Sequence, residues 1–367
     1  MNRAGIVGLG LWVPSRVRTN DEWSPEFVAA FERDRASRAQ RDFTALDAPG
    51  PPRAFEPLFA KHALPYESDP FKGATERRVS DGELTTAECD ARAAVRALDD
   101  AKVLPNDVDL ILASALVPDR LIPSNGPTIQ HLVGCSKAPG IGVEAVCSSA
   151  LAHLDLAAAL VESGRARYVL CVQSHQIARI NDLAIPFSPL FGDASSAFVV
   201  GPVREGRGLA KLSRDGDGSL AGGITHAYKE TPGACWYRDA SGPIHPGSED
   251  VEAARYVGRN LIRFAAEAIA ELCAGASLPL DAIAALAMIQ PAVWYQAAVA
   301  EALGISPDKA PSTYAKFAHL GAAGVVANLL EAREKGLLRE GAPVVLYAHG
   351  AGLTRYAALL RWGGRLA

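Results

Sequence analysis

Cys147 stands between a segment predicted to be a strand and one predicted to be a helix. Ile141–Val146 before it is largely apolar and partly β-branched, which predicts a buried strand. Ser148–Ser163 after it is rich in alanine and stops before Gly164, which predicts a helix. The partial positive charge of the helix N-terminus favours thiolate over thiol. We therefore expect a nucleophilic cysteine whose pKa lies below the usual value of about 8.5. The alternative is a small buried core residue.

The composition is that of a globular protein with two domain-sized parts. The 367 residues are 49% hydrophobic and 21% charged, with a formal net charge of −4. This charge gives no electrostatic reason to bind nucleic acid or an anionic membrane. No apolar run approaches the ~18 residues of a membrane-spanning helix. The six cysteines form no C-x-x-C pair and the histidines lack metal-ligand spacing. We expect free thiols in a reducing cytoplasm and no metal site.

The first seventy residues combine a predicted strand with a polar insertion. Ala4–Val13 is apolar, but it has one basic residue before it and no cleavage site, which favours a strand over a signal peptide. Residues 20–72 are polar, charged and interrupted by prolines, with one helical stretch near Pro25–Arg38. Long segments of this kind tend to be functional. We expect this one to cover the mouth of a pocket.

The second half of the chain repeats the order of elements in the first. A Leu-Pro-x-Asp turn occurs at Leu104–Asp107 and again at Leu278–Asp281, each time after a predicted helix and before a predicted strand. Such self-similarity indicates an internal duplication, and the alternation predicts α/β layers around buried sheets. We expect halves over 1–205 and 206–367, with an active site where they meet. The predicted helices include 85–98, 127–133, 148–163, 251–274 and 292–303, and the predicted strands 4–13, 108–116, 141–146, 168–173 and 282–289.

These features resemble the thiolase superfamily and, more closely, the β-ketoacyl-acyl-carrier-protein synthase III family. The resemblance implies an α/β, thiolase-like fold with two duplicated βαβαβαββ halves in α/β/α/β/α layers. It also implies a cytoplasmic homodimer that takes its acyl group from a coenzyme A or phosphopantetheine thioester and holds no permanent cofactor. The matching segments follow the family's order and cover nearly the whole chain outside 20–72: Gly5–Pro14, Arg18–Asn20, Gly73–Arg77, Cys147–Ala150, Phe191–Ala197, Gly350–Thr354 and Ala358–Trp362.

The catalytic set departs from the pattern of this family, whose condensing members use a cysteine, a histidine and an asparagine. Alignment on Leu303–Gly304 puts Ile289, just before Gln290, at the histidine position. The same alignment puts His319 at the asparagine position, as if the imidazole had moved between the two. Condensation needs two donors for an enolate oxygen, and loss of one donor typically costs about 2.7–4 kcal/mol. Ile289 offers no donor, so condensation is disfavoured.

We therefore expect an acyltransferase that carries an acyl group on Cys147 and passes it to the hydroxyl or amine of a small-molecule acceptor, in polyketide-type biosynthesis. His319 is the expected base, and a structural, buried histidine is the alternative. By resemblance, the backbone N–H groups of Cys147 and Ala351 form the oxyanion hole, and Gly350 lets that backbone approach closely. The alternative functions are a decarboxylative, carbon–carbon condensing ketosynthase III and a non-catalytic partner chain.

Four further residues are candidates for supporting or substrate-binding roles. His349 and Gln290 are expected to support the site, and structural packing or hydrogen bonding is the alternative for each. Ile122 falls where the family sends an apolar residue into the partner subunit's acyl pocket. Glu144, three residues before the nucleophile, is a candidate for binding the acceptor, and a surface pairing is its alternative.

Overall fold

Two β-sheets form the framework of the protein, whose computed structural model describes residues 3–39, 55–184, 186–228 and 244–366. The first sheet contains, in spatial order, β1 (Arg3–Trp12), β7 (Ala194–Val203), β6 (Val169–His175), β4 (Leu110–Ala115) and β5 (Gly140–Gly142). The second contains β11 (Ala285–Met288), β12 (Pro343–Gly350), β13 (Thr354–Arg361) and β8 (Gly208–Gly216). The two sheets draw on different halves of the chain, and the domain boundary at 205/206 stays a prediction.

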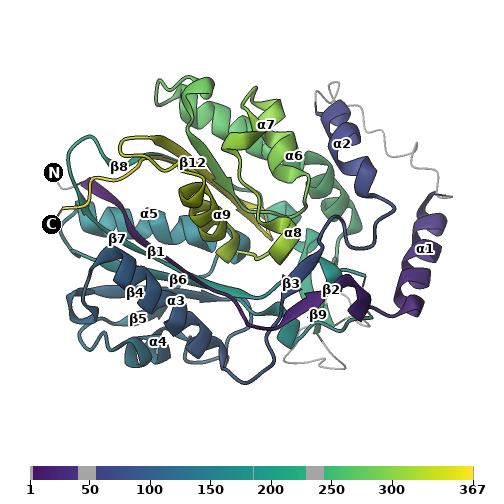
Figure 1. Cartoon of the computed structure of the whole chain (residues 1–367), viewed down its shortest axis with the longest axis horizontal. Helices are drawn as coiled ribbons and strands as arrows, with labels where there is room; N and C mark the ends of the chain where they lie inside the picture. Colours follow the sequence, from purple (N-terminus) through teal and green to yellow (C-terminus); the bar gives the residue numbers. More distant parts are fainter. Residues whose placement is uncertain (1–2, 40–54, 185, 229–243, 367) are drawn as a thin grey trace.

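Helices lie on both faces of the pair of sheets and between them, which gives five layers (Figure 1). The outer face of the first sheet carries α3 (Thr86–Ala101) and α4 (Gly126–Val133), and that of the second carries α6 (Val251–Ala274) and α7 (Tyr295–Ala302). The middle layer consists of α5 (Ser149–Glu162) and α9 (Ala323–Glu334). This arrangement confirms the predicted α/β/α/β/α, thiolase-like fold.

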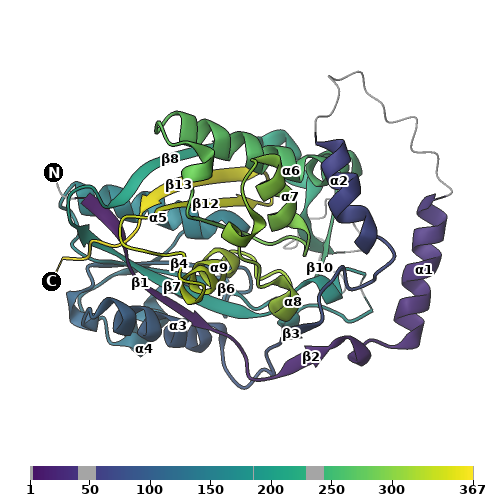
Figure 2. The same ribbon diagram turned by 45° about the horizontal axis from the view of Figure 1, so that its top comes forward.

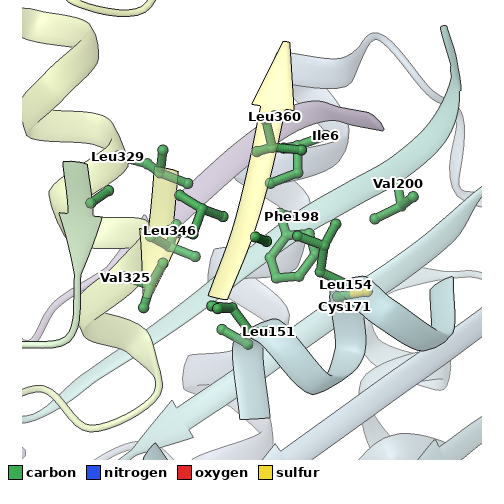
Figure 3. Packing of buried hydrophobic residues seen from close by; sticks show 14 of the residues in the cluster. Ile6, Leu151, Leu154, Cys171, Phe198, Val200, Val325, Leu329, Leu346 and Leu360 are labelled. Atoms are coloured by element: carbon green, nitrogen blue, oxygen red, sulfur yellow. The ribbon is translucent and has the colours of Figure 1, made fainter. Parts of the chain in front are cut away.

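Apolar side chains of the middle layer join the two sheets (Figure 3). Leu151 and Leu154 of α5 are buried in one cluster with Phe198 of the first sheet and Leu346 of the second. Val325 of α9 belongs to the same cluster. Because α5 is packed on both sides, its N-terminus, where Cys147 lies, is held in a fixed position relative to both halves.

One predicted strand is wrong. Residues 141–146 do not form a buried strand, because β5 ends at Gly142 and pairs only with β4 at the edge of the sheet. Ile141 is 45% exposed. The apolar sequence correctly predicted an extended segment here. Because β5 lies at the edge of the sheet beside one strand, its side chains stay accessible to solvent. The chain then turns before Cys147 instead of continuing as a strand.

The insertion contributes α1 (Pro25–Ala39) and α2 (Glu56–Ala63), which lie at the opposite end of the molecule from both chain termini (Figures 1 and 2). α2 packs on α7: the Phe59 ring lies edge-on 5.5 Å from that of Trp294, and Lys61 Nζ lies 2.8 Å from Glu301 Oε1. Part of the insertion, 40–54, lies outside the described residues. Its predicted role in covering a pocket stays a prediction.

The remaining elements are short. They are the two-stranded sheets β2 (Val17–Thr19) with β3 (Glu76–Arg78) and β9 (Thr225–Tyr228) with β10 (Ile244–Gly247), and the helix α8 (Tyr314–Phe317). Across the described part of the chain, every helix is too short or too polar to cross a membrane. Five of the six cysteines fall in this part and are free thiols, and Cys235 lies outside it.

Candidate active site

Cys147 lies in a tight turn that leads directly into α5. The turn is strained, because Val146 has φ = +51°, a left-handed conformation that is unusual for a β-branched residue. The side chain of Glu144 stabilises it: Oε1 accepts hydrogen bonds from Val146 N at 2.7 Å and Ser149 Oγ at 2.9 Å. Ser149 Oγ in turn accepts from Ala145 N at 2.9 Å. The polar network therefore fixes the turn that holds Cys147 at the helix start.

His319, in the loop between α8 and α9, brings its imidazole to the thiol. Nε2 lies 3.5 Å from Cys147 Sγ. Nδ1 lies 2.8 Å from the backbone oxygen of Gln290, and because a carbonyl only accepts, Nδ1 carries the proton and Nε2 presents its lone pair to the sulfur. The backbone N of His319 donates to Leu190 O at 2.9 Å. This loop is thus fixed on both sides of the ring.

Both members of this pair are neutral at pH 7. Burial, followed by the negative charge of Glu144, raises the pKa of Cys147 to about 12. The expected lowering of this pKa is therefore wrong: the helix N-terminus does not outweigh desolvation and a nearby carboxylate. Burial also lowers the pKa of His319 to about 4. Little thiolate therefore forms by loss of the proton to solvent at pH 7, and direct transfer from Cys147 to Nε2 of His319 is the alternative route.

The turn after β12 makes close backbone contact with the cysteine turn. A Cβ on Gly350 would lie 2.4 Å from Ala145 O and 3.0 Å from Ser148 Oγ, so only glycine fits there. This contact places the next residue, Ala351, beside the start of α5. An oxyanion hole formed by the N–H groups of Cys147 and Ala351 stays a prediction.

His349 and Gln290 both lie close to His319. His349 is buried, with its ring 6.1 Å from that of Tyr295 and 5.9 Å from that of Tyr347. Its Nδ1 has no hydrogen-bond partner among the described residues. Burial and the neighbouring His319 lower the pKa of His349 to about 3, so this ring is also neutral.

Gln290 supports the site through its backbone rather than its amide. Its carbonyl accepts from His319, whereas its side chain is used by the preceding loop: Nε2 donates to Ser312 Oγ at 2.6 Å and Oε1 accepts from Thr313 Oγ1 at 2.7 Å. Ile289, before it, is fully buried and contributes to the core.

Ile122 is not brought to the site within one chain. Its side chain is 85% exposed, and it does not line the cavity beside Cys147. Glu144 does line that cavity. Its Oε1 is occupied by the turn, which provides a structural role that the sequence did not indicate. The predicted substrate-binding roles of both residues stay predictions.

His175 is the residue that sequence reasoning missed. It ends β6, lines the cavity beside Cys147, and its ring lies 5.7 Å from that of His319. The available signal was its position at the carboxyl end of a strand, where α/β sheets commonly bind ligands. Over the ranges that the structure describes, no three His, Cys, Asp or Glu side chains gather as metal ligands.

Comparisons with known proteins agree with this framework. The protein-family model described as 3-oxoacyl-[acyl-carrier-protein] synthase III matches residues 141–218. The family model described as its C-terminal part matches residues 273–362. The β-ketoacyl-[acyl-carrier-protein] synthase III of Geobacillus kaustophilus is 26% identical over 365 residues, 98% of this chain and 99% of that protein. Synthase III 1 of Bacillus anthracis is 27% identical over 296 residues, 79% and 88% of the two chains. The Thermus thermophilus synthase III structure has a TM-score of 0.76 and 28% identity, covering 98% and 100%.

The layered duplicated fold, with a cysteine opening the central helix, is a thiolase-like fold. The chain is similar in sequence to the β-ketoacyl-acyl-carrier-protein synthase III enzymes, as its sequence segments predicted. It is therefore an enzyme of the transferase class.

The expected acyl transfer to a hydroxyl or amine is wrong. The relatives, which match 79% to 98% of the chain, are named β-ketoacyl-[acyl-carrier-protein] synthases, which are condensing enzymes. Acyl transfer was expected mainly because Ile289 offers no hydrogen-bond donor to an enolate oxygen, and this absence was given too much weight. Other residues of the site carry N–H groups, so one aliphatic residue at one position does not exclude condensation.

Proposed function

We propose that the protein is a condensing ketosynthase that joins an acyl group to a malonyl thioester with loss of carbon dioxide. The observation that carries this proposal is the 3.5 Å separation of Cys147 Sγ and His319 Nε2 within a synthase III-like framework. In a fold built for acyl-enzyme chemistry, this pair provides the nucleophile and the base that activates it.

The first step loads the acyl group. His319 Nε2 takes the proton of Cys147, and the thiolate attacks the carbonyl carbon of the acyl thioester. The carbon–sulfur bond to the carrier then breaks, and the departing carrier thiolate takes the proton from His319. The products are an acyl group on Cys147, a free carrier thiol and a neutral imidazole. The N–H groups of Cys147 and Ala351 are the proposed donors to the tetrahedral oxyanion.

The second step forms the carbon–carbon bond. The carboxylate of the malonyl thioester leaves as carbon dioxide, and the electron pair of the broken bond forms an enolate. The enolate carbon attacks the acyl carbonyl, the bond to Cys147 Sγ breaks, and the released thiolate takes a proton from water. The enolate oxygen needs a donor, and we assign this to a ring N–H of His349, supported by its unpartnered Nδ1 and its position beside His319.

We propose further that the acyl donor is a coenzyme A or phosphopantetheine thioester and that the enzyme is a cytoplasmic homodimer. The dimer is supported by the outer edge of β5, which has no neighbouring strand among the described residues, and by the exposed apolar side chains of Leu121 and Ile122, which are 73% and 85% accessible. In this arrangement, Ile122 would reach the pocket of the second copy. A role in polyketide-type biosynthesis stays a prediction.

The test measures carbon dioxide and product from malonyl-coenzyme A or malonyl carrier protein together with an acyl thioester. We expect carbon dioxide release to depend on the acyl thioester and on Cys147, and to persist in His131→Gln, a surface control. A stable acyl-enzyme without carbon dioxide release would refute the proposed condensation. Absence of any mass gain on Cys147 would support the non-catalytic alternative.

A further inference from the structure

The cavity beside Cys147 is small, and its largely apolar wall, which includes Leu116, Val146 and Ala322, is interrupted by a few polar atoms. Its volume is about 10 Å³, close to what is needed to hold one water molecule. It therefore admits about one non-hydrogen atom of an acyl chain without rearrangement. Its polar lining residues besides Cys147 are Glu144, Ser114, Ser174 and His175.

His175 presents a hydrogen-bond acceptor to this cavity. Its Nδ1 lies 2.8 Å from the backbone oxygen of Gly192, so Nδ1 carries the proton and Nε2 carries the lone pair. The ring is held in place by Gly321, where a Cβ would lie 2.3 Å from Cδ2 and 3.1 Å from Nε2 of His175. Burial lowers the pKa of this histidine to about 3, which keeps it neutral. Nε2 is therefore an acceptor throughout the physiological range.

Ser174 presents a second acceptor, because its proton is used by a buried network behind the cavity. Ser195 Oγ donates to Asp90 Oδ1 at 2.6 Å and accepts from Gln176 Nε2 at 3.3 Å. The one hydrogen-bonding site left on Ser195 Oγ is a lone pair. Ser174 Oγ lies 3.4 Å from Ser195 Oγ. Burial raises the pKa of Asp90 to about 7. When Asp90 is ionised, Ser195 donates to it and Ser174 donates to Ser195, away from the cavity. The lone pairs of Ser174 Oγ are then left for a ligand.

Two further polar side chains line the cavity. The carboxylate of Glu144 can only accept hydrogen bonds, whereas the hydroxyl of Ser114 can donate or accept. An alkyl group placed here would leave buried acceptors without partners, which is unfavourable.

We propose that this cavity selects acyl groups that carry a hydroxyl or ammonium next to the thioester carbonyl. The proposal rests on the acyl-Cys147 intermediate of the proposed function and adds the class of its acyl donor. The selective contacts are Nε2 of His175 and Oγ of Ser174, with Glu144 adding attraction for a cationic group.

Three acyl groups of equal size test the proposal: propionyl, glycolyl and glycyl, each as the pantetheine thioester. Loading of Cys147 in a single turnover is followed by intact mass, and each rate is divided by the rate of the same thioester with free glutathione, which removes differences in intrinsic reactivity. We expect the corrected rate for glycolyl, glycyl or both to exceed that for propionyl at least tenfold. Faster loading of the glycolyl thioester would identify a hydroxyl as the preferred substituent, and faster loading of the glycyl thioester would identify an ammonium. Corrected rates equal to or below that of propionyl for both would overturn the proposal.

Two variants assign the preference to the wall. Ser174→Ala and His175→Phe should each reduce the ratio of the preferred acyl group to propionyl to within about threefold, whereas the surface control Ser163→Ala should retain it. If His175→Phe does not fold, Ser174→Ala, which removes one oxygen atom, still decides. An unchanged ratio in Ser174→Ala overturns the assignment. Failure of the proposed condensation is distinct, because it would appear as loading of Cys147 without carbon dioxide release from malonyl thioesters, and the loading ratios would still be measurable.

Discussion

Replacement of His319 by alanine should change both the rate of Cys147 acylation and its dependence on pH. In the native pair, the proton moves from sulfur to Nε2 without entering solvent. Since the pKa values of His319 and Cys147 are about 4 and about 12, the neutral, active pair persists between these limits. The acylation rate should therefore be nearly flat from about pH 6 to 9, and it should fall at acidic pH as His319 becomes protonated and no longer accepts a proton.

The magnitude follows from the 3.5 Å separation of Sγ and Nε2. A thiolate and an imidazolium at this distance attract each other by about 5 kcal/mol at an effective dielectric constant of about 20. Protonation of His319 at pH 7, three units above its pKa of about 4, costs about 4 kcal/mol, so the ion pair alone accounts for only a few-fold. Proton transfer to a positioned base in the transition state adds about 100-fold or more. We therefore expect a loss of about 100-fold at pH 7.

The pH profile separates loss of a base from loss of structure. In His319→Ala, only thiolate in equilibrium with solvent reacts, so the acylation rate should rise about tenfold per pH unit from pH 6 to 9. His319→Asn, which restores the family's amide but supplies no base, should show the same slope, and His131→Gln should keep the flat profile. The assay is single-turnover acylation followed by intact mass. A wild-type profile that rises tenfold per pH unit would show that His319 is not the base.

Three further substitutions test the cysteine turn. Glu144→Gln removes the charge that raises the Cys147 pKa but keeps an oxygen acceptor for the turn, so alkylation by iodoacetamide at pH 8 should become faster, by about two- to tenfold. Gly350→Ala places a methyl group 2.4 Å from Ala145 O, and the displaced turn should slow acylation at least 100-fold; an unchanged rate would contradict the close approach. Val146→Gly relieves a left-handed valine, so thermal denaturation should show a stability gain of about 1 kcal/mol, and a loss of stability would show that the turn is not strained.

The candidate site was only partly predictable because its parts come from distant segments. A cysteine at the start of a helix is a local feature, and the sequence placed Cys147 correctly. His319 was reached through alignment to a family, and its ring does lie beside the thiol. His175 was not predicted as a site residue. Nothing in the local sequence indicates that the end of β6, which carries His175, lies beside the loop after α8, which carries His319. The direction of the Cys147 pKa was also wrong, because burial and the orientation of Glu144 depend on packing that the sequence does not show.

By itself, the sequence determined the layered duplicated fold, the position of Cys147 at the start of a helix and the resemblance to condensing enzymes. Helix and strand periodicity, the repeated Leu-Pro-x-Asp turn and glycines such as Gly350 are local requirements that the chain must satisfy wherever it folds. Only the tertiary structure decided the protonation states of Cys147 and His319, the strain at Val146 and the position of His175 beside Cys147. These properties depend on desolvation and on atoms brought within a few ångströms from distant segments, and no single segment carries that information.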